Sequence, residues 1–311
     1  MVEPTLTVNA VSQSEIDNAV SRAAAYIQRN IRNPEIGSEW AILGLARSNQ
    51  RIPDTYFNRY FRAVEQYVRE RNGVLDGRRF TEYSRVIIAL TAAGFDPRNV
   101  AGFDLTVSLG DFERTIWQGV NGSIFALLAL DSLNYTIPLN ENAQTQASRE
   151  MYIAEILRQQ NTDGGWSLSG DIGDSDITGM ALQALAKYQE NSDVAVAIDN
   201  ALAFLSNTQN NNGGFSNSFS QAPNLESSVQ VLVALTELGL PVDDPRFVKN
   251  GNTILDNILS FQNRDGSFSH SPGSNESNLI STSQALYGLV AAQRAAEGRN
   301  SLYRMSDRRV R

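Results

Sequence analysis

The amino-acid sequence predicts an all-α fold built from two concentric rings of helices. Two observations predict it: a strongly apolar segment recurs six times, and amphipathic segments with one wet side alternate with it. A helix that is apolar all round is buried on every side, whereas an amphipathic helix buries its apolar face and exposes its polar face to solvent. The alternation therefore indicates an inner ring of buried helices and an outer ring of half-exposed ones.

The recurring apolar segment is marked by a leucine that follows a small residue. This leucine returns at intervals of 40 to 55 residues, and such an interval holds two helices and two connections. The six leucines are Leu45, Leu90, Leu130, Leu185, Leu235 and Leu289. Four copies end in Gly or Asn followed by Pro, which supplies a left-handed cap and then stops the helix.

The outer-ring helices are recognised by apolar residues at steps of three and four. This spacing places the apolar side chains on one helical face. The clearest faces are Ile16, Val20, Ala23, Ile27 and Ile31; Val194, Ile198, Leu202 and Leu205; and Ile254, Ile258 and Phe261.

A glutamine–glycine–aromatic motif follows the amphipathic segments in the second half of the chain. Its copies are Gln160, Gly164 and Trp166; Gln209, Gly213 and Phe215; and Gln262, Gly266 and Phe268. We expect the glycine to take positive φ in a tight turn. The aromatic ring should fill the gap between neighbouring hairpins, and the glutamine should cap backbone groups at a helix end.

Composition excludes several classes of function. The chain has no Cys and a single His, His270, so it cannot build a zinc–thiolate site, a thioester or a cluster of imidazoles. Acidic residues outnumber basic ones by 34 to 26, and no Lys/Arg run offers a stripe for nucleic acid. No apolar run approaches the roughly 20 residues of a membrane span, and no signal-peptide pattern opens the sequence.

These motifs resemble the α/α toroid of terpenoid cyclases and prenyltransferases, in which six helical hairpins close into a barrel. Within that superfamily the chain is similar to secreted bacterial prenyltransferase/squalene-oxidase repeat proteins, and through them to the helical domain of the cobalamin carriers intrinsic factor and transcobalamin. The matching stretches are residues 37–48, 174–186, 244–251 and 300–305.

The resemblance implies one toroid over residues 14–298, with an N-terminal tail at residues 1–13. Residues 299–311 are then expected to be a C-terminal tail, or a linker to the β-rich and cell-wall-anchoring domains that such proteins often carry. The resemblance also implies an extracellular or cell-surface bacterial protein.

The chemistry of class II cyclases would fall on one loop of this chain. Their Asp-x-Asp-Asp motif has its nearest match at Asp174–Ile177, where Asp176 aligns with the proton donor and Ile177 replaces the last Asp. The alternative is that Asp174 or Asp176 caps the helix that follows. The same loop supplies candidate Ca²⁺ ligands, Asp171, Asp174 and Asp176.

Acidic residues also begin several recurring segments. Because inner helices of a toroid run parallel, Glu39, Glu82, Asp176 and Glu226 are expected at one mouth of the ring. Two such carboxyl groups could cleave a glycan if they lie about 5 to 10 Å apart. They could equally offset the positive ends of the helix dipoles without doing chemistry.

The remaining candidate ligand-binding residues are mostly aromatic. They lie on or beside the inner segments or in the motif loops, where a ring either fills the core or offers a ligand a flat apolar wall. This set comprises Trp40, Tyr83, Trp117, Asn121, Trp166, Phe268 and Tyr287. His270 is expected to be exposed and unpaired.

The sequence leaves three functions open. The leading hypothesis is non-catalytic ligand binding at the inner-helix mouth, with a corrinoid as the ligand that the resemblance implies and no cofactor fixed. The second is a structural or adhesive surface module without a small ligand. The third is an enzyme, degenerate or intact, that acts on a terpenoid or glycan through Asp176.

Overall fold

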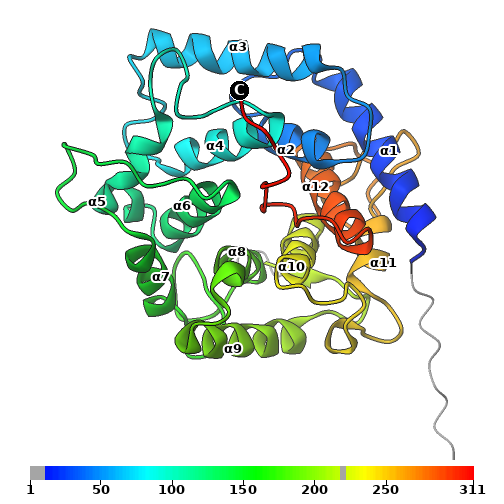
Figure 1. Cartoon of the computed structure of the whole chain (residues 1–311). Coiled ribbons are helices and arrows are strands. Elements are labelled where there is room, and N and C mark those ends of the chain that lie inside the picture. The colour runs from blue at the N-terminus through cyan, green and yellow to red at the C-terminus, as the bar shows by residue number, and fades with distance from the viewer. Residues whose placement is uncertain (1–10, 218–221) are drawn as a thin grey trace, which may run out of the picture.

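The computed structural model describes residues 11–217 and 222–311. Residues 1–10 of the expected N-terminal tail lie outside this part of the chain, and helix α1 begins directly after its cap, Ser12. The described helices form two concentric rings (Figure 1). The inner ring consists of α2 (Glu39–Arg47), α4 (Thr81–Ala93), α6 (Val120–Ser132), α8 (Ser175–Leu185), α10 (Leu225–Glu237) and α12 (Leu279–Ala296).

Each inner helix has an outer partner that precedes it in the chain. The outer ring consists of α1 (Gln13–Asn30), α3 (Asp54–Glu70), α5 (Phe112–Ile116), α7 (Arg149–Arg158), α9 (Ser192–Thr208) and α11 (Ile254–Leu259). Short 3₁₀ helices lie at Leu105–Gly110, Ala186–Tyr188 and Pro245–Phe247, and strands β1 (Phe215–Ser216) and β2 (Pro223–Asn224) pair antiparallel with Phe215 opposite Asn224. The arrangement confirms the predicted all-α, six-hairpin toroid.

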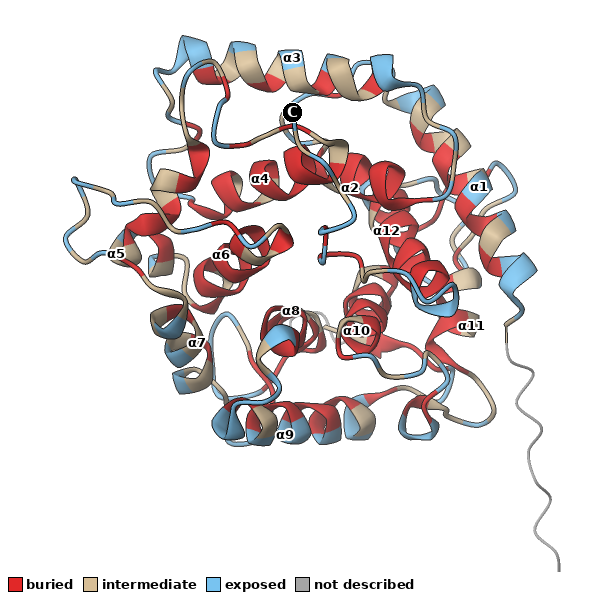
Figure 2. Ribbon diagram, viewed as in Figure 1, coloured by how far each residue is buried: buried red, intermediate tan, exposed pale blue. Residues whose placement is uncertain are grey.

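The core lies between the two rings and around the inner helices. Helix α10 is buried at nearly every position, whereas α9 buries only the face that carries Val194, Ile198 and Leu205. Figure 2 shows the same contrast around the ring, with buried inner helices and outer helices exposed on their far side. None of the described helices is both long and apolar enough to cross a membrane.

The three motif glutamines join each turn to the next hairpin. The Nε2 atom of Gln160 donates to the carbonyls of Gly164 and Ala197, both at 2.8 Å. Gln209 does the same with the carbonyls of Gly213 and Phe247, at 2.8 and 2.9 Å. The motif glycines have φ between 83° and 93°, so the left-handed conformation predicted for them is present.

The last copy of the motif closes the ring onto the first helix. Gln262 Nε2 donates to the carbonyl of Ala19 in α1 at 3.2 Å. Arg22 returns a bond of 2.6 Å to the carbonyl of Asn263. A Cβ atom on Gly266 would lie 2.6 Å from the Arg22 carbonyl oxygen, so a larger residue there would push the ring open.

The C-terminal segment, residues 299–311, differs from the tail or linker expected from the sequence. It turns back after α12 and crosses the opening of the ring (Figure 1). Leu302 and Met305 are fully buried. The Met305 amide donates to the carbonyl of Ser132 at 2.7 Å, and the Arg311 amide donates to the carbonyl of Gly94 at 3.0 Å. The segment therefore packs as part of the toroid.

Candidate functional site

A pocket lies where the inner helices begin, and all six of them contribute to it. Its volume is about 260 Å³. The lining residues are Trp40 from α2, Thr81 and Arg85 from α4, Asn121 and Phe125 from α6, Asp176 and Met180 from α8, Glu226 and Gln230 from α10, and Gln284 from α12. We call this cavity the mouth pocket. It brings together four residues expected from the sequence: Trp40, Asn121, Asp176 and Glu226.

Asp174 and Asp176 have different roles, although only one residue separates them. Asp174 is extended and caps α8, accepting hydrogen bonds from the amides of Asp176 and Ile177 at 2.9 and 3.2 Å. Asp176 sits in the first turn and lines the mouth pocket. Its Oδ1 atom is buried and has no hydrogen-bond partner within the described residues.

The pKa of the Asp176 carboxyl is raised to about 7, chiefly because the group is buried. The hydroxyl of Ser227 opposes the rise, and the nearby negative charges of Asp174 and Glu226 reinforce it. Near neutral pH the carboxyl is therefore partly protonated, and it can donate as well as accept a hydrogen bond.

Glu226 is held in place by two side chains that the sequence places far from it. The hydroxyl of Ser281 donates to Oε1 at 2.5 Å, and Nδ1 of His270 lies 2.7 Å from Oε2. His270 is therefore exposed but paired, contrary to the expectation that it stands alone.

Two further lining residues of the mouth pocket also carry a buried polar atom. Arg85 forms an ion pair with Glu82 through Nη2 at 2.5 Å, but its Nε atom is buried and unbonded in the described part of the chain. The Oδ1 atom of Asn121 is also buried and has no hydrogen-bond partner among the described residues. With Asp176, three residues that line one pocket each carry a buried hydrogen-bonding atom without a partner in the described protein. Burying such atoms without a partner costs free energy.

The wall and floor of the mouth pocket are aromatic and amide groups. The Trp40 ring centroid lies 5.9 Å from that of Phe125 and 5.6 Å from that of Tyr287. Beneath them, Gln230 Nε2 bonds to Tyr287 Oη at 2.5 Å and to Gln284 Oε1 at 3.1 Å. Tyr287, a candidate ligand contact from the sequence, is therefore a buried support for the floor.

Several other expected site residues serve the core instead. Glu39 is 3 % exposed and turns toward the outer ring, where Tyr60 Oη lies 3.3 Å from its Oε1 atom. Tyr83 Oη accepts a bond from the Leu75 amide at 3.0 Å. Trp166 and Phe268 have no exposed surface and fill the gaps between hairpins, so a ligand cannot reach them.

The candidate Ca²⁺ ligands do not assemble. Asp171 is exposed in its loop while Asp174 caps a helix. Within residues 11–217 and 222–311, no group of three acidic or histidine side chains could hold a metal ion.

Trp117 does not line the mouth pocket, but its neighbour in the chain bonds to a residue that does. Its side chain is 55 % exposed, and the Arg78 guanidinium stacks over the indole at 4.2 Å from the ring centroid. The next residue, Gln118, bonds to the backbone amide and the hydroxyl of Thr81 at 3.0 and 3.1 Å. Because Thr81 lines the mouth pocket, these bonds hold the segment that carries Trp117 beside the pocket wall, and we call this position the rim.

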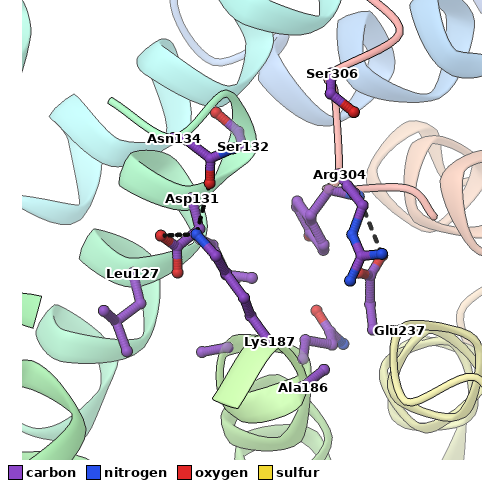
Figure 3. Close-up of a pocket in the computed structure, with 13 residues that line it drawn as sticks. Leu127, Asp131, Ser132, Asn134, Ala186, Lys187, Glu237, Arg304 and Ser306 are labelled. Carbon is purple, nitrogen blue, oxygen red and sulfur yellow. Dashed lines mark hydrogen bonds and ion pairs between the residues drawn. The ribbon is translucent and has the colours of Figure 1, made fainter. Parts of the chain in front are cut away.

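The opposite end of the ring is occupied by the C-terminal segment. A smaller cavity of about 180 Å³ remains there (Figure 3). Lys187 spans it and bonds to Asp131 at 2.8 Å and Asn134 at 2.6 Å, while Arg304 lies beside Glu237. The basic side chains face the negative ends of the inner helices, which is the favourable orientation.

Six lining residues were not predicted as site residues: Thr81, Arg85, Phe125, Met180, Gln230 and Gln284. Arg85, Gln230 and Gln284 each lie one or more turns after the start of an inner helix. The sequence could indicate these residues only through their position near the start of an inner helix, because parallel inner helices bring their first turns to one mouth.

Comparisons with known proteins agree with the fold. A type II terpene cyclase from Scytonema superposes with a TM-score of 0.59 at 13% identity, over 91% of this chain and 98% of the cyclase. An unsaturated glucuronyl hydrolase from Streptococcus agalactiae gives 0.62 at 11% identity, over 93% and 94%. Protein geranylgeranyltransferase-I from Candida albicans gives 0.57 at 13% identity, over 87% and 90%.

Identities this low establish a shared fold and no shared activity. No curated protein sequence matches the chain. The family model described as the prenyltransferase alpha-alpha toroid domain matches residues 118–282 and 228–306, which together exceed half of the chain. The chain therefore belongs to the prenyltransferase alpha-alpha toroid domain family.

Proposed function

We propose that this protein binds a small polar ligand in the mouth pocket without transforming it. The supporting observation is that three residues lining one cavity, Arg85, Asn121 and Asp176, each carry a buried polar atom without a partner in the described structure. A ligand that bonds to them removes a cost that the free protein bears. We further propose, from the resemblance to secreted repeat proteins, that binding takes place outside the cell or at its surface.

A corrinoid remains part of this proposal as the largest ligand to test. Pockets that enclose drug-sized ligands have volumes of about 300–1,000 Å³. The mouth pocket, at about 260 Å³, would admit only an edge of a corrinoid ring. A corrinoid would therefore bind weakly here unless a second domain covered its other face.

Acid catalysis is the second candidate function, and one observation favours it. A carboxyl group with a pKa of about 7 is matched to proton transfer at neutral pH. Glu226 lines the same pocket as a second carboxylate. Under this alternative Asp176 donates a proton to a glycan or terpenoid, and Asp176→Asn abolishes turnover while the fold persists.

A thermal-unfolding screen tests the proposal. The probes are cyanocobalamin, geranylgeranyl diphosphate and mixed short glycans, each with wild type and with Asn121→Leu, which removes one unpartnered atom from the pocket. A ligand at 100 times its Kd adds about 2.7 kcal/mol and raises the midpoint by several degrees. We expect one probe class to stabilise the wild type and to lose that effect in Asn121→Leu.

The matched control is Asn207→Leu, on the exposed surface of α9. It should respond to ligand as the wild type does. If no probe moves the wild-type midpoint, the ligand-binding proposal is wrong and the structural or adhesive role takes its place. Product formation that is lost in Asp176→Asn would favour the enzyme instead.

A further inference from the structure

The polar atoms, the apolar walls and the rim of the mouth pocket together select one class of ligand. We propose that the ligand is a neutral saccharide, with one sugar ring in the mouth pocket and a following ring stacked on Trp117. This inference rests on the proposed function and specifies the ligand of the same site.

The unused hydrogen-bonding atoms fit hydroxyl groups. Arg85 Nε can only donate, the Asn121 Oδ1 atom can only accept, and Asp176 does either according to its protonation. A sugar hydroxyl both donates and accepts, so the hydroxyls of one ring match each of these three side chains in hydrogen-bonding type. An isoprenoid chain carries no such groups and would leave the three atoms buried and unbonded.

The apolar surfaces of the pocket fit the faces of a sugar ring. Trp40, Phe125 and Met180 line one cavity together with the amides of Gln230 and Gln284. A sugar ring has the same combination, since its C–H faces are apolar and its edge carries hydroxyls. Saccharide recognition therefore needs flat apolar walls beside convergent polar groups, which is the general arrangement of small-molecule pockets.

The size of the pocket limits it to one ring. At about 260 Å³ it lies below the usual range of about 300–1,000 Å³ for drug-sized ligands. The remaining rings of a longer saccharide must lie on the rim, where Trp117 is 55 % exposed. The Arg78 guanidinium packs on the indole, 4.2 Å from the ring centroid, and the next residue, Gln118, bonds to Thr81 of the pocket wall.

The charges of the pocket favour a neutral sugar over an acidic one. Asp176 and Glu226 both line the cavity, and the cation that lines it, Arg85, is already paired with Glu82. A uronate placed there would face two carboxyl groups without a free cation among the described lining residues. The solved relative that cleaves unsaturated glucuronyl groups is therefore a guide to the fold and not to the sugar.

A glycan array followed by calorimetry tests this proposal. The array carries neutral, N-acetylated and uronate-containing glycans, and we expect the bound ones to be neutral or N-acetylated. A bound tetrasaccharide and its monosaccharide are then titrated into wild type, Trp117→Ala, Trp117→Phe and Val196→Ala. Trp117→Ala should weaken the tetrasaccharide about tenfold and leave the monosaccharide unchanged.

The other variants are controls for stacking. Trp117→Phe keeps an aromatic face and should retain most of the affinity. Val196 is 61 % exposed on α9, so Val196→Ala removes an exposed apolar side chain far from the mouth and should change neither titration. Equal losses for the two saccharides in Trp117→Ala, or binding confined to uronate glycans, would overturn the proposal.

The outcomes separate this proposal from the one on which it rests. Suppose that no glycan binds, while cyanocobalamin or geranylgeranyl diphosphate stabilises the wild type but not Asn121→Leu. The saccharide proposal is then wrong, and the proposal that the mouth pocket binds a ligand stands. If none of the probes binds, both proposals fail.

Discussion

Asp307 lies 2.7 Å from Nη1 of Arg47, and this ion pair joins the end of the chain to the first inner helix. The same carboxylate lies 2.6 Å from Nη2 of Arg294 in α12. Both guanidinium groups have no exposed surface, whereas Asp307 is one-third exposed. A single carboxylate therefore pairs with two buried cations, and the C-terminal segment is an integral part of the fold.

Asp307→Ala should destabilise the protein by about 3 kcal/mol, because it leaves two buried guanidinium groups without a counter-ion. Burial lowers the pKa of Arg294 only to about 10, so it stays charged at neutral pH. Urea unfolding measures the loss. Glu297→Ala is the control, since its partner Arg299 is exposed and such pairs contribute about 0–1 kcal/mol. Equal effects of the two substitutions would show that Asp307 is not a structural counter-ion.

Gln209→Ala tests the motif that joins neighbouring hairpins. The substitution removes both bonds from Nε2 and leaves the buried carbonyls of Gly213 and Phe247 with one donor fewer. We expect a loss of about 1–3 kcal/mol in the free energy of unfolding. Gln189→Ala, at an exposed glutamine that bonds only locally, should stay within about 0.5 kcal/mol of wild type. A neutral Gln209→Ala would refute the joining role.

Asp176→Asn should raise stability in a pH-dependent way. The folded carboxyl has a pKa of about 7 against 3.8 when unperturbed, so between about pH 4 and pH 7 the folded state holds a proton that the unfolded state has released. Wild-type stability therefore falls as pH rises through this window. Asparagine removes the fall, and the variant should exceed wild type by up to about 4 kcal/mol at pH 8 and match it near pH 4.

Urea unfolding at pH 4 and pH 8 measures this difference. Asp171→Asn is the matched control. Because Asp171 is exposed in the preceding loop, its substitution should leave the free energy of unfolding unchanged at both pH values. Identical stabilities of wild type and Asp176→Asn at pH 8 would mean that the charged Asp176 carboxylate does not destabilise the folded protein.

Ligand affinity should also depend on pH through Asp176. If the protonated carboxyl donates to a ligand hydroxyl, the affinity for a neutral saccharide falls about tenfold for each pH unit above 7. Asp174, Glu226, His270 and Ser227 all influence this carboxyl, so the profile is compared with that of Asp176→Asn. The variant should bind with an affinity that is flat above pH 7. A falling profile in the variant would show that Asp176 does not set the pH dependence.

The ring of helices was predictable because its signals repeat. The six leucines and the three Gln–Gly–aromatic motifs encode the hairpins locally, and each copy supports the others. The C-terminal segment has no such signal. Leu302 and Met305 are isolated apolar residues in a polar, arginine-rich stretch, so no periodicity shows that they are buried in the ring.

The candidate site was predictable in place but not in detail. Parallel inner helices put the acidic residues near one mouth, yet rotation about each helix decides where a side chain points. Glu39 therefore turns to Tyr60 while Asp176 faces the pocket. The pairing of Glu226 with His270, 44 residues away, depends on tertiary contacts that no local pattern encodes.

The most direct test of the account is the titration of Asp176 itself. Carboxyl ¹³C chemical shifts followed by NMR from pH 3 to pH 9, assigned by their loss in Asp176→Asn, report the pKa of this group in the folded protein. We predict a midpoint near 7 that shifts when a neutral saccharide binds. A midpoint near 4, unchanged by saccharide, would show a solvated carboxylate and contradict the mouth pocket as a binding site.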